Sequence, residues 1–232
     1  MASMNTPNAG ARWLLAVAAP AEAGAVLRAA GSTVPHVSAW TPFRLSESCD
    51  LVMTGVGKVN AGGCVAHLAG RGYAGVLSTG IAGALPGSGL ELGQSVLATA
   101  SAYADEGLLT PEGFTDCATM GFPLGPFPAT GIVPDAGMAA VLEKFADRQG
   151  VIATVSTCSG TDALAAEVVR RTEALAEAME GAAVAHVAAR LGVPSAELRV
   201  VSNTTGHRDR QRWEMAGALA GLTRVLGPLV AG

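Results

Sequence analysis

The sequence predicts an α/β fold, a three-layer sandwich in which helices flank a central mixed β-sheet. Short apolar runs alternate with alanine-rich helical stretches from end to end, which is typical of this class. Half of the residues are hydrophobic and only 15% are charged, so the chain must bury a large core. Neither an internal repeat nor a linker divides the chain. We therefore expect one domain over residues 11–232, preceded by a disordered tail at residues 1–10.

Six apolar runs have the length and the β-branched content of buried strands. They are residues 13–18, 51–54, 75–79, 95–100, 151–156 and 198–202. Six further segments have the composition of helices. They are residues 21–30, 60–70, 136–148, 162–176, 180–191 and 209–230.

The first apolar run follows Arg12 and faintly resembles a signal peptide. It is short, however, and leads straight into a helical segment, which favours a first core strand. None of the apolar runs approaches the ~18 residues of a membrane span. We therefore expect no association with a membrane.

The segment 107–134 departs from this pattern, because it contains five prolines, several glycines and three phenylalanines. A loop this long in a compact domain is usually functional or mobile. Its aromatic side chains either cover an apolar ligand group or take part in ordinary surface packing or a dimer contact. The sequence leaves both interpretations open.

Charge and cysteine content restrict the partners. A net charge of −4 and a pI near 5.5 argue against nucleic acid, because phosphate neutralisation requires clustered Lys and Arg. The large apolar fraction predicts that some burial is subunit interface, hence a homo-oligomer. Four cysteines without CxxC spacing indicate reduced thiols of a cytoplasmic protein. The four histidines share no metal-ligand spacing, so no metal site is expected.

Met179 and Glu180 stand at the start of a helix of small residues. A carboxylate has about four lone-pair sites, which suits it to accept hydrogen bonds from two vicinal hydroxyls of a ribose. Met179 would then pack under the sugar. The alternative is that Glu180 only stabilises the positive end of the helix dipole.

The strand at 198–202 ends on Ser202 and Asn203. An amide can donate a hydrogen bond to a 6-oxopurine, whereas a carboxylate would meet its O6 acceptor with repulsion. Asn203 therefore indicates hypoxanthine or guanine as the departing base, unless it merely forms the turn before Gly206. Arg199 lies four residues before Asn203, so the strand period of two predicts that both share one face.

Together these motifs resemble those of the nucleoside phosphorylase and nucleosidase superfamily. Asn203, in place of an aspartate after the serine, makes them most similar to the futalosine hydrolases. The resemblance covers nearly the whole chain in order and implies a nucleoside phosphorylase-like fold. It also implies that Glu22 is the general base for the attacking water and that Arg199 helps to hold this water. The alternative for Glu22 is a carboxylate favoured by the helix dipole.

The segment Ser78 to Ala84 resembles the glycine-rich loop that lies beneath the ribose in this superfamily, with Gly80 and Ile81 at the substrate. Phosphorylases place Ser or Thr near the position of Ile81 to hold phosphate. An anion site requires donors and positive charge, and this segment offers only backbone N–H groups. Water is therefore the expected nucleophile.

Four further residues are substrate-binding candidates, and three of them are carried over from the resemblance. Thr161 and Asp162 match a base-contacting loop, and Trp213 matches a pocket-lining aromatic residue. Arg208 is the arginine nearest to that pocket in sequence, and is expected to bind a carboxylate on the 5′ side of the substrate, with Arg210 and Arg212 as the alternatives. The turn at 55–58 matches neither a phosphate loop nor a dinucleotide motif.

The activity implied is hydrolysis of the N-glycosidic bond of futalosine to hypoxanthine and dehypoxanthine futalosine, a step of menaquinone biosynthesis, with no cofactor. Three alternatives remain open. A methylthioadenosine/adenosylhomocysteine nucleosidase is disfavoured by Asn203, and a 6-oxopurine nucleoside phosphorylase by Ile81. A non-catalytic nucleoside-binding module on the same fold is disfavoured by Glu22 and Glu180.

Overall fold

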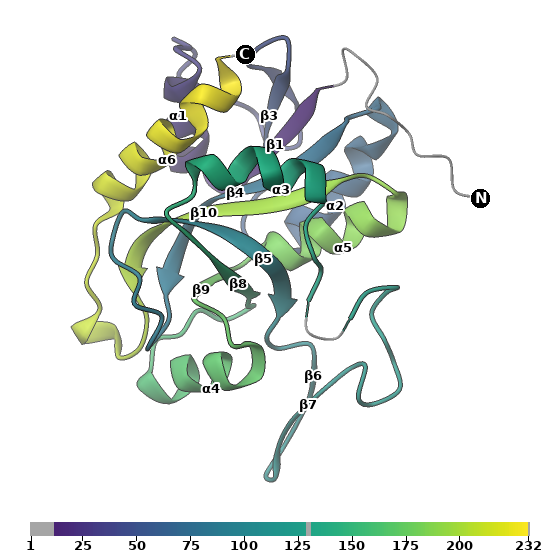
Figure 1. The fold of residues 1–232 in the computed structure, drawn as a ribbon, viewed down its shortest axis with the longest axis vertical. Coiled ribbons are helices and arrows are strands. Elements are labelled where there is room, and N and C mark those ends of the chain that lie inside the picture. Colours follow the sequence, from purple (N-terminus) through teal and green to yellow (C-terminus); the bar gives the residue numbers. More distant parts are fainter. Residues whose placement is uncertain (1–11, 129–130, 232) are drawn as a thin grey trace.

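The computed structural model describes residues 12–128 and 131–231 (Figure 1). The tail expected at residues 1–10 lies outside this range. Among the helices of the described part, none has the length and apolar character required to cross a membrane.

An eight-stranded mixed sheet forms the centre of the molecule, in the order β10-β5-β8-β9-β4-β1-β3-β2. Its strands are β1 (Trp13–Val17), β2 (Phe43–Arg44), β3 (Cys49–Met53), β4 (Gly75–Ala84), β5 (Ser95–Tyr103), β8 (Arg148–Thr154), β9 (Ala176–Ala178) and β10 (Ser195–Thr204). This confirms the predicted mixed sheet. In addition, β10 pairs with β4, so that β10, β5, β8, β9 and β4 close into a ring.

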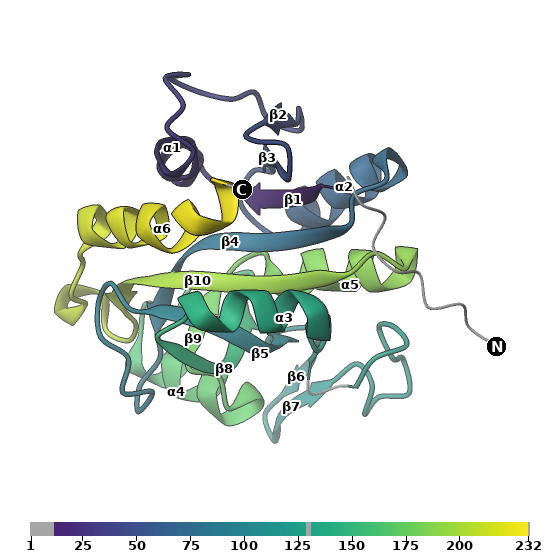
Figure 2. The same cartoon turned by 45° about the horizontal axis from the view of Figure 1, so that its top comes forward.

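Helices cover both faces of the sheet, as predicted (Figures 1 and 2). On one face α1 packs against α6, and on the other α2 packs against α5. The helices are α1 (Pro20–Ala29), α2 (Lys58–Leu68), α3 (Ala136–Leu142), α4 (Asp162–Thr172), α5 (Gly181–Leu191) and α6 (Met215–Val230). Short 3-10 turns occupy Ala69–Arg71, Glu143–Phe145 and Arg208–Arg210.

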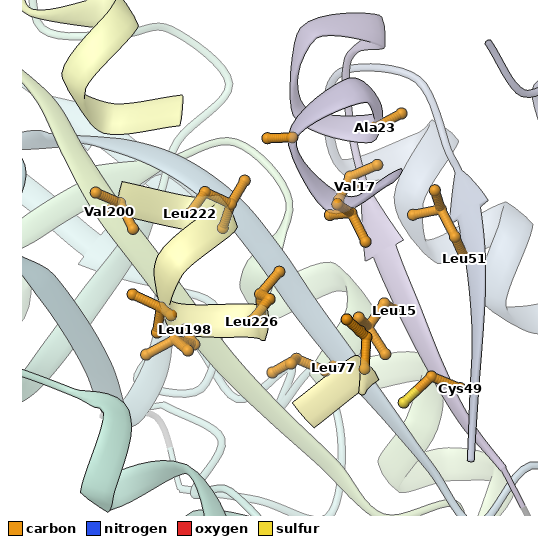
Figure 3. Close-up of a cluster of buried hydrophobic side chains, with 14 of the residues drawn as sticks. Leu15, Val17, Ala23, Cys49, Leu51, Leu77, Leu198, Val200, Leu222 and Leu226 are labelled. Atoms are coloured by element: carbon orange, nitrogen blue, oxygen red, sulfur yellow. The ribbon is translucent and has the colours of Figure 1, made fainter. Parts of the chain in front are cut away.

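Strand β1 shows why the apolar runs are continuous rather than alternating. Leu15 points into the core beneath α1 and α6, together with Leu198 and Leu222 (Figure 3). Leu14 joins the opposite core, where it meets Val184 of α5. Because both faces of the strand are buried, every position is apolar.

The prediction of a helix over residues 162–176 is wrong at the C-terminal end. Helix α4 stops at Thr172, since Glu173 adopts a left-handed conformation with φ 54°. Ala176–Ala178 instead forms β9, which pairs with β8 and β4. An Ala-Glu-Ala segment has helical propensity, so only the pairing on both sides makes it a strand.

Two other helices are also shorter than expected. The helix predicted over 136–148 ends at Leu142, and β8 begins at Arg148. Asp147 anchors this transition because its carboxylate accepts hydrogen bonds from the backbone and the hydroxyl of Ser95 at 2.8 Å. The helix predicted over 209–230 begins at Met215, after the 3-10 turn.

The segment 107–134 contains a hairpin rather than only loop. Strands β6 (Gly107–Thr110) and β7 (Gly113–Asp116) pair antiparallel, and Gly113 supplies a positive φ of 134° at the turn. The sequence did not predict these two short strands, because proline and glycine are unfavourable within strands.

Candidate active site

The C-terminal ends of β1, β4 and β10 meet the start of α5 around a cavity of about 290 Å³. A second cavity of about 210 Å³ adjoins it and shares five of its lining residues. The shared residues are Gly83, Cys158, Glu177, Asn203 and Trp213. The larger cavity also brings together seven of the residues predicted from the sequence. They are Glu22, Ile81, Met179, Glu180, Ser202, Asn203 and Trp213.

Glu22 is buried at the first turn of α1, and its carboxylate is held by three backbone N–H groups. Ala18 and Ala19 donate to Oε2, and Ile81 donates to Oε1, each at 2.9 Å. Burial raises the pKa of Glu22 above its ordinary value of 4.5, against the lowering effects of Arg199 and these backbone donors. Glu22 is thus both a helix cap and a cavity residue, and its role as general base stays a prediction.

Gly80 allows β4 to approach this carboxylate. Its φ is 146°, and a β-carbon on it would lie 2.2 Å from Oε1 of Glu22. The segment 78–84, expected to be a loop, is part of β4 because β10 and β9 pair with its two edges. Gly80 itself lies behind Glu22 and does not line the cavity.

The Glu180 carboxylate lies between the 55–58 turn and strand β10. Gly57 donates its backbone N–H to Oε1 at 3.0 Å, and an Arg199 guanidinium nitrogen lies 3.3 Å from Oε2. The 55–58 turn therefore contributes to the site through a backbone N–H. Lys58 points elsewhere and pairs with Asp105 and Glu106.

Arg199 is completely buried among three carboxylates. It contacts Glu197 at 2.9 Å and the hydroxyl of Ser78 at 3.0 Å, in addition to Glu180. Burial disfavours its charge, but Glu197, Glu180 and Glu22 outweigh this effect and raise the pKa of Arg199. Arg199 does not line the cavity, so it contacts the Glu180 carboxylate from behind.

A β-bulge in β10 separates Arg199 from Asn203. The pairing with β4 skips Ser202. The prediction that Arg199 and Asn203 share one face assumed an unbroken period of two, and the bulge breaks this period. Ser202 donates to Oδ1 of Asn203 at 2.8 Å, and Nδ2 of Asn203 donates to the Thr204 carbonyl at 3.0 Å. An amide nitrogen carries two N–H donors, so one remains for a ligand.

Thr161 and Asp162 lie outside both cavities. Thr161 caps α4 by accepting from Leu164, and Asp162 holds the 3-10 turn by pairing with Arg210 and the backbone of His207. Their predicted contact with the base stays a prediction. The neighbouring Ser159 and Gly160 are the residues of this loop that line the smaller cavity.

Arg208 and Trp213 form the outer wall of the smaller cavity. The Arg208 guanidinium lies 4.7 Å from the centre of the Trp213 ring, and Trp213 is held against Asn203 by an isolated β-bridge. The predicted proximity of these two residues is therefore present. Both are also tied to Gln211 by hydrogen bonds.

Two buried carboxylates of this region were missed by the sequence analysis, Glu177 and Glu197. Glu197 lies on β10 beside Arg199 and accepts a hydrogen bond from the Ser101 hydroxyl. Glu177 lies on β9, which the sequence did not reveal. Glu197 stands two residues before Arg199, directly before the apolar run 198–202, and this charge pair was the available signal.

Comparison with known proteins agrees with this geometry. Residues 15–225 match the family model of the phosphorylase superfamily. A futalosine hydrolase from Streptomyces coelicolor is 40% identical over 225 residues, which cover 93% of this chain and 94% of that protein. The chain belongs to the phosphorylase superfamily and, within it, to the futalosine hydrolases. A second futalosine hydrolase, from Acidothermus cellulolyticus, is 39% identical and covers 94% of this chain and 90% of that protein.

A solved structure of a 5′-methylthioadenosine/S-adenosylhomocysteine nucleosidase shares the fold of this futalosine hydrolase family member. That enzyme, from S. pneumoniae, aligns with a TM-score of 0.76 and 22% identity over 95% of this chain and 98% of its own. The fold class and the family resemblance predicted from the sequence are both confirmed.

Proposed function

We propose that this protein hydrolyses the N-glycosidic bond of futalosine and releases hypoxanthine and dehypoxanthine futalosine. The observation that carries the proposal is the meeting of Glu22, Glu180 and Asn203 on one cavity, in a chain of the futalosine hydrolase family. In this arrangement Glu22 supplies a base, Glu180 accepts hydrogen bonds from a diol, and Asn203 donates a hydrogen bond to a purine. The substrate is accordingly a nucleoside, and the family membership indicates which one.

In this proposal the reaction passes through an oxocarbenium-like transition state, as in other glycoside cleavage. Glu22 takes a proton from water, and its raised pKa brings the carboxylate closer to the pH at which a base works best. Glu180 accepts hydrogen bonds from the ribose hydroxyls, with Met179 beneath the sugar. Asn203 donates to the departing base. Arg199 orients Glu180 from behind and balances its charge.

Water rather than phosphate is the nucleophile in this proposal. None of the described residues that line the larger cavity is Lys or Arg. The guanidinium of Arg199, which lies behind Glu180, is already paired with Glu180 and Glu197. Ile81 presents an apolar side chain where a phosphate would require a hydroxyl donor.

The proposal includes the organisation expected from the sequence, namely a cytoplasmic homo-oligomer whose subunit is one nucleosidase domain over residues 11–232. Exposed apolar side chains of the 107–134 segment support the oligomer. Leu109 is 69% exposed and Phe122 is 70% exposed. Both side chains belong to the same segment, and exposed apolar surface is typical of interaction sites.

The decisive experiment is one assay with futalosine, inosine and methylthioadenosine, each with and without phosphate. We expect release of hypoxanthine from futalosine at a rate that added phosphate does not change. Strict phosphate dependence, or formation of a sugar 1-phosphate, would contradict the hydrolase proposal. Preference for methylthioadenosine would instead assign the chain a different nucleosidase activity.

A further inference from the structure

Glu177 is a buried carboxylate in the cavity that the proposed mechanism does not use. It lies in the middle of β9 and lines both cavities, although only 5% of the residue is exposed. Its carboxylate accepts two hydrogen bonds from Ser159, from the backbone N–H at 2.7 Å and from the hydroxyl at 2.6 Å. A carboxylate has about four lone-pair sites, so capacity for a ligand donor remains.

The sheet places Glu177 opposite Asn203. Gly83 of β4 pairs with Glu177 of β9 on one side and with Asn203 of β10 on the other, so the three residues form one cross-strand row. Gly83 has no side chain, and the position of a β-carbon there would be 3.2 Å from Nδ2 of Asn203 and 3.7 Å from Cγ of Glu177. An amide and a carboxylate therefore converge on the cavity from both sides of Gly83.

This pair of groups matches the polar edge of a 6-oxopurine. Such a base presents acceptors at N7 and O6 and, next to O6, a donor at N1–H. The free N–H of Asn203 suits the acceptors and the carboxylate of Glu177 suits the donor. An adenine presents an unprotonated N1 acceptor at that place, which an ionised carboxylate repels.

We propose that Glu177 selects 6-oxopurines by accepting a hydrogen bond from N1–H of the base, while Asn203 donates to the neighbouring acceptors. The proposal deepens the proposed function, because it assigns the base specificity of the same site. Ser159 then has a positioning role, since its two hydrogen bonds orient the carboxylate.

Binding of free bases to Glu177→Gln tests this role separately from hydrolysis. A glutamine keeps the size of the side chain and an oxygen acceptor for Ser159, but it adds an N–H₂ donor. Isothermal titration calorimetry gives the affinities for hypoxanthine and for adenine. The ratio of the hypoxanthine affinity to the adenine affinity should be about ten- to a hundredfold lower in the variant than in the parent, the range expected for one hydrogen bond to a charged group. 1-Methylhypoxanthine, which lacks the N1–H donor, should bind the parent protein weakly.

Asp50→Asn is the matched control, because it changes another buried carboxylate of the same sheet, on β3, that lies outside both cavities. It should leave the ratio of hypoxanthine to adenine affinity unchanged. Equal weakening of both bases by Glu177→Gln would overturn the inference and leave Glu177 as a support for Ser159. Base discrimination that depends on Glu177, without cleavage of futalosine, would contradict only the proposed function.

Discussion

Glu22 illustrates how one side chain serves structure and chemistry at once. The same carboxylate accepts the backbone N–H groups at the start of α1 and faces the cavity beside Ile81. Backbone donors stabilise the ionised form, yet burial prevails and raises the pKa. The carboxylate is therefore rigidly placed without becoming a weak base.

The pH dependence of kcat/KM should reveal this raised pKa. A general base works in its ionised form, so activity should fall as the pH falls through the pKa of Glu22, which lies above 4.5. We expect a decline of about tenfold per pH unit on the acid side. The profile of futalosine cleavage between pH 4 and pH 9 measures it.

The Glu177→Gln variant provides the control for this assignment, because burial raises the pKa of Glu177 as well. The decline of kcat/KM on the acid side, the acid limb of the profile, should occur at the same pH in that variant. A limb that disappears with Glu177, or one that lies below pH 4.5, would mean that Glu22 does not limit the reaction.

Glu180→Gln should lower kcat/KM by about a hundredfold or more. Two hydrogen bonds from hydroxyls to a charged carboxylate contribute about 3 kcal/mol or more together, and the proposal places them mainly in the transition state. Steady-state kinetics and urea unfolding of the same variant separate the two effects. Near-parental activity, or a loss matched by unfolding of the protein, would make Glu180 a structural residue.

Strand β9 and the 3-10 turn at Arg208–Arg210 show how short elements complete the cavity. Each has three residues. Strand β9 brings Glu177 to the smaller cavity, and the turn brings Arg208 to the outer wall of the same cavity. The ring closure by β10 and β4 places Glu177 opposite Asn203 across Gly83. Elements this short are positioned by their neighbours rather than by their own propensity.

Arg208→Ala should raise KM for futalosine about ten- to a hundredfold and spare inosine, which has no carboxylate on its 5′ side. A charge-assisted hydrogen bond between a guanidinium and a carboxylate is worth about 1.5–3 kcal/mol. Arg212→Ala is the control, since Arg212 is exposed and lines neither cavity. Equal losses on both substrates would instead indicate that Arg208 supports Trp213 and the turn.

Across the whole molecule, stability depends on the core that joins α1 and α6 to the sheet. Leu198 of β10, Leu77 of β4 and Leu226 of α6 are fully buried in it (Figure 3). The cavity with its buried carboxylates lies at the ends of these same strands. The large apolar core therefore holds in place the buried charges that the site requires.

Leu198→Ala should destabilise the protein by about 2–5 kcal/mol, because it leaves a cavity in a close-packed core. Urea unfolding should show a lower midpoint with an unchanged m-value. Substitution of the exposed Glu91 by alanine should shift the free energy of unfolding by no more than about 0.5 kcal/mol. A loss below 1 kcal/mol for Leu198→Ala would indicate that the strands can close over the gap.

The sequence by itself determined the fold class, the order of most elements and the family. Alternating apolar runs report which segments are buried, and motifs such as Met179–Glu180 and Ser202–Asn203 keep their local chemistry wherever the fold places them. These features depend on neighbours along the chain. They can therefore be predicted without knowledge of the tertiary structure.

Only the tertiary structure decided the contacts between distant segments. Ala176–Ala178 is a strand because β8 and β4 pair with it, and Arg199 lies among Glu22, Glu180 and Glu197 because three elements converge there. The bulge at Ser202 similarly breaks a periodicity that the sequence alone cannot show to be broken. Hydrogen bonds and charges between strands far apart in sequence set these arrangements, and local propensity contains no information about them.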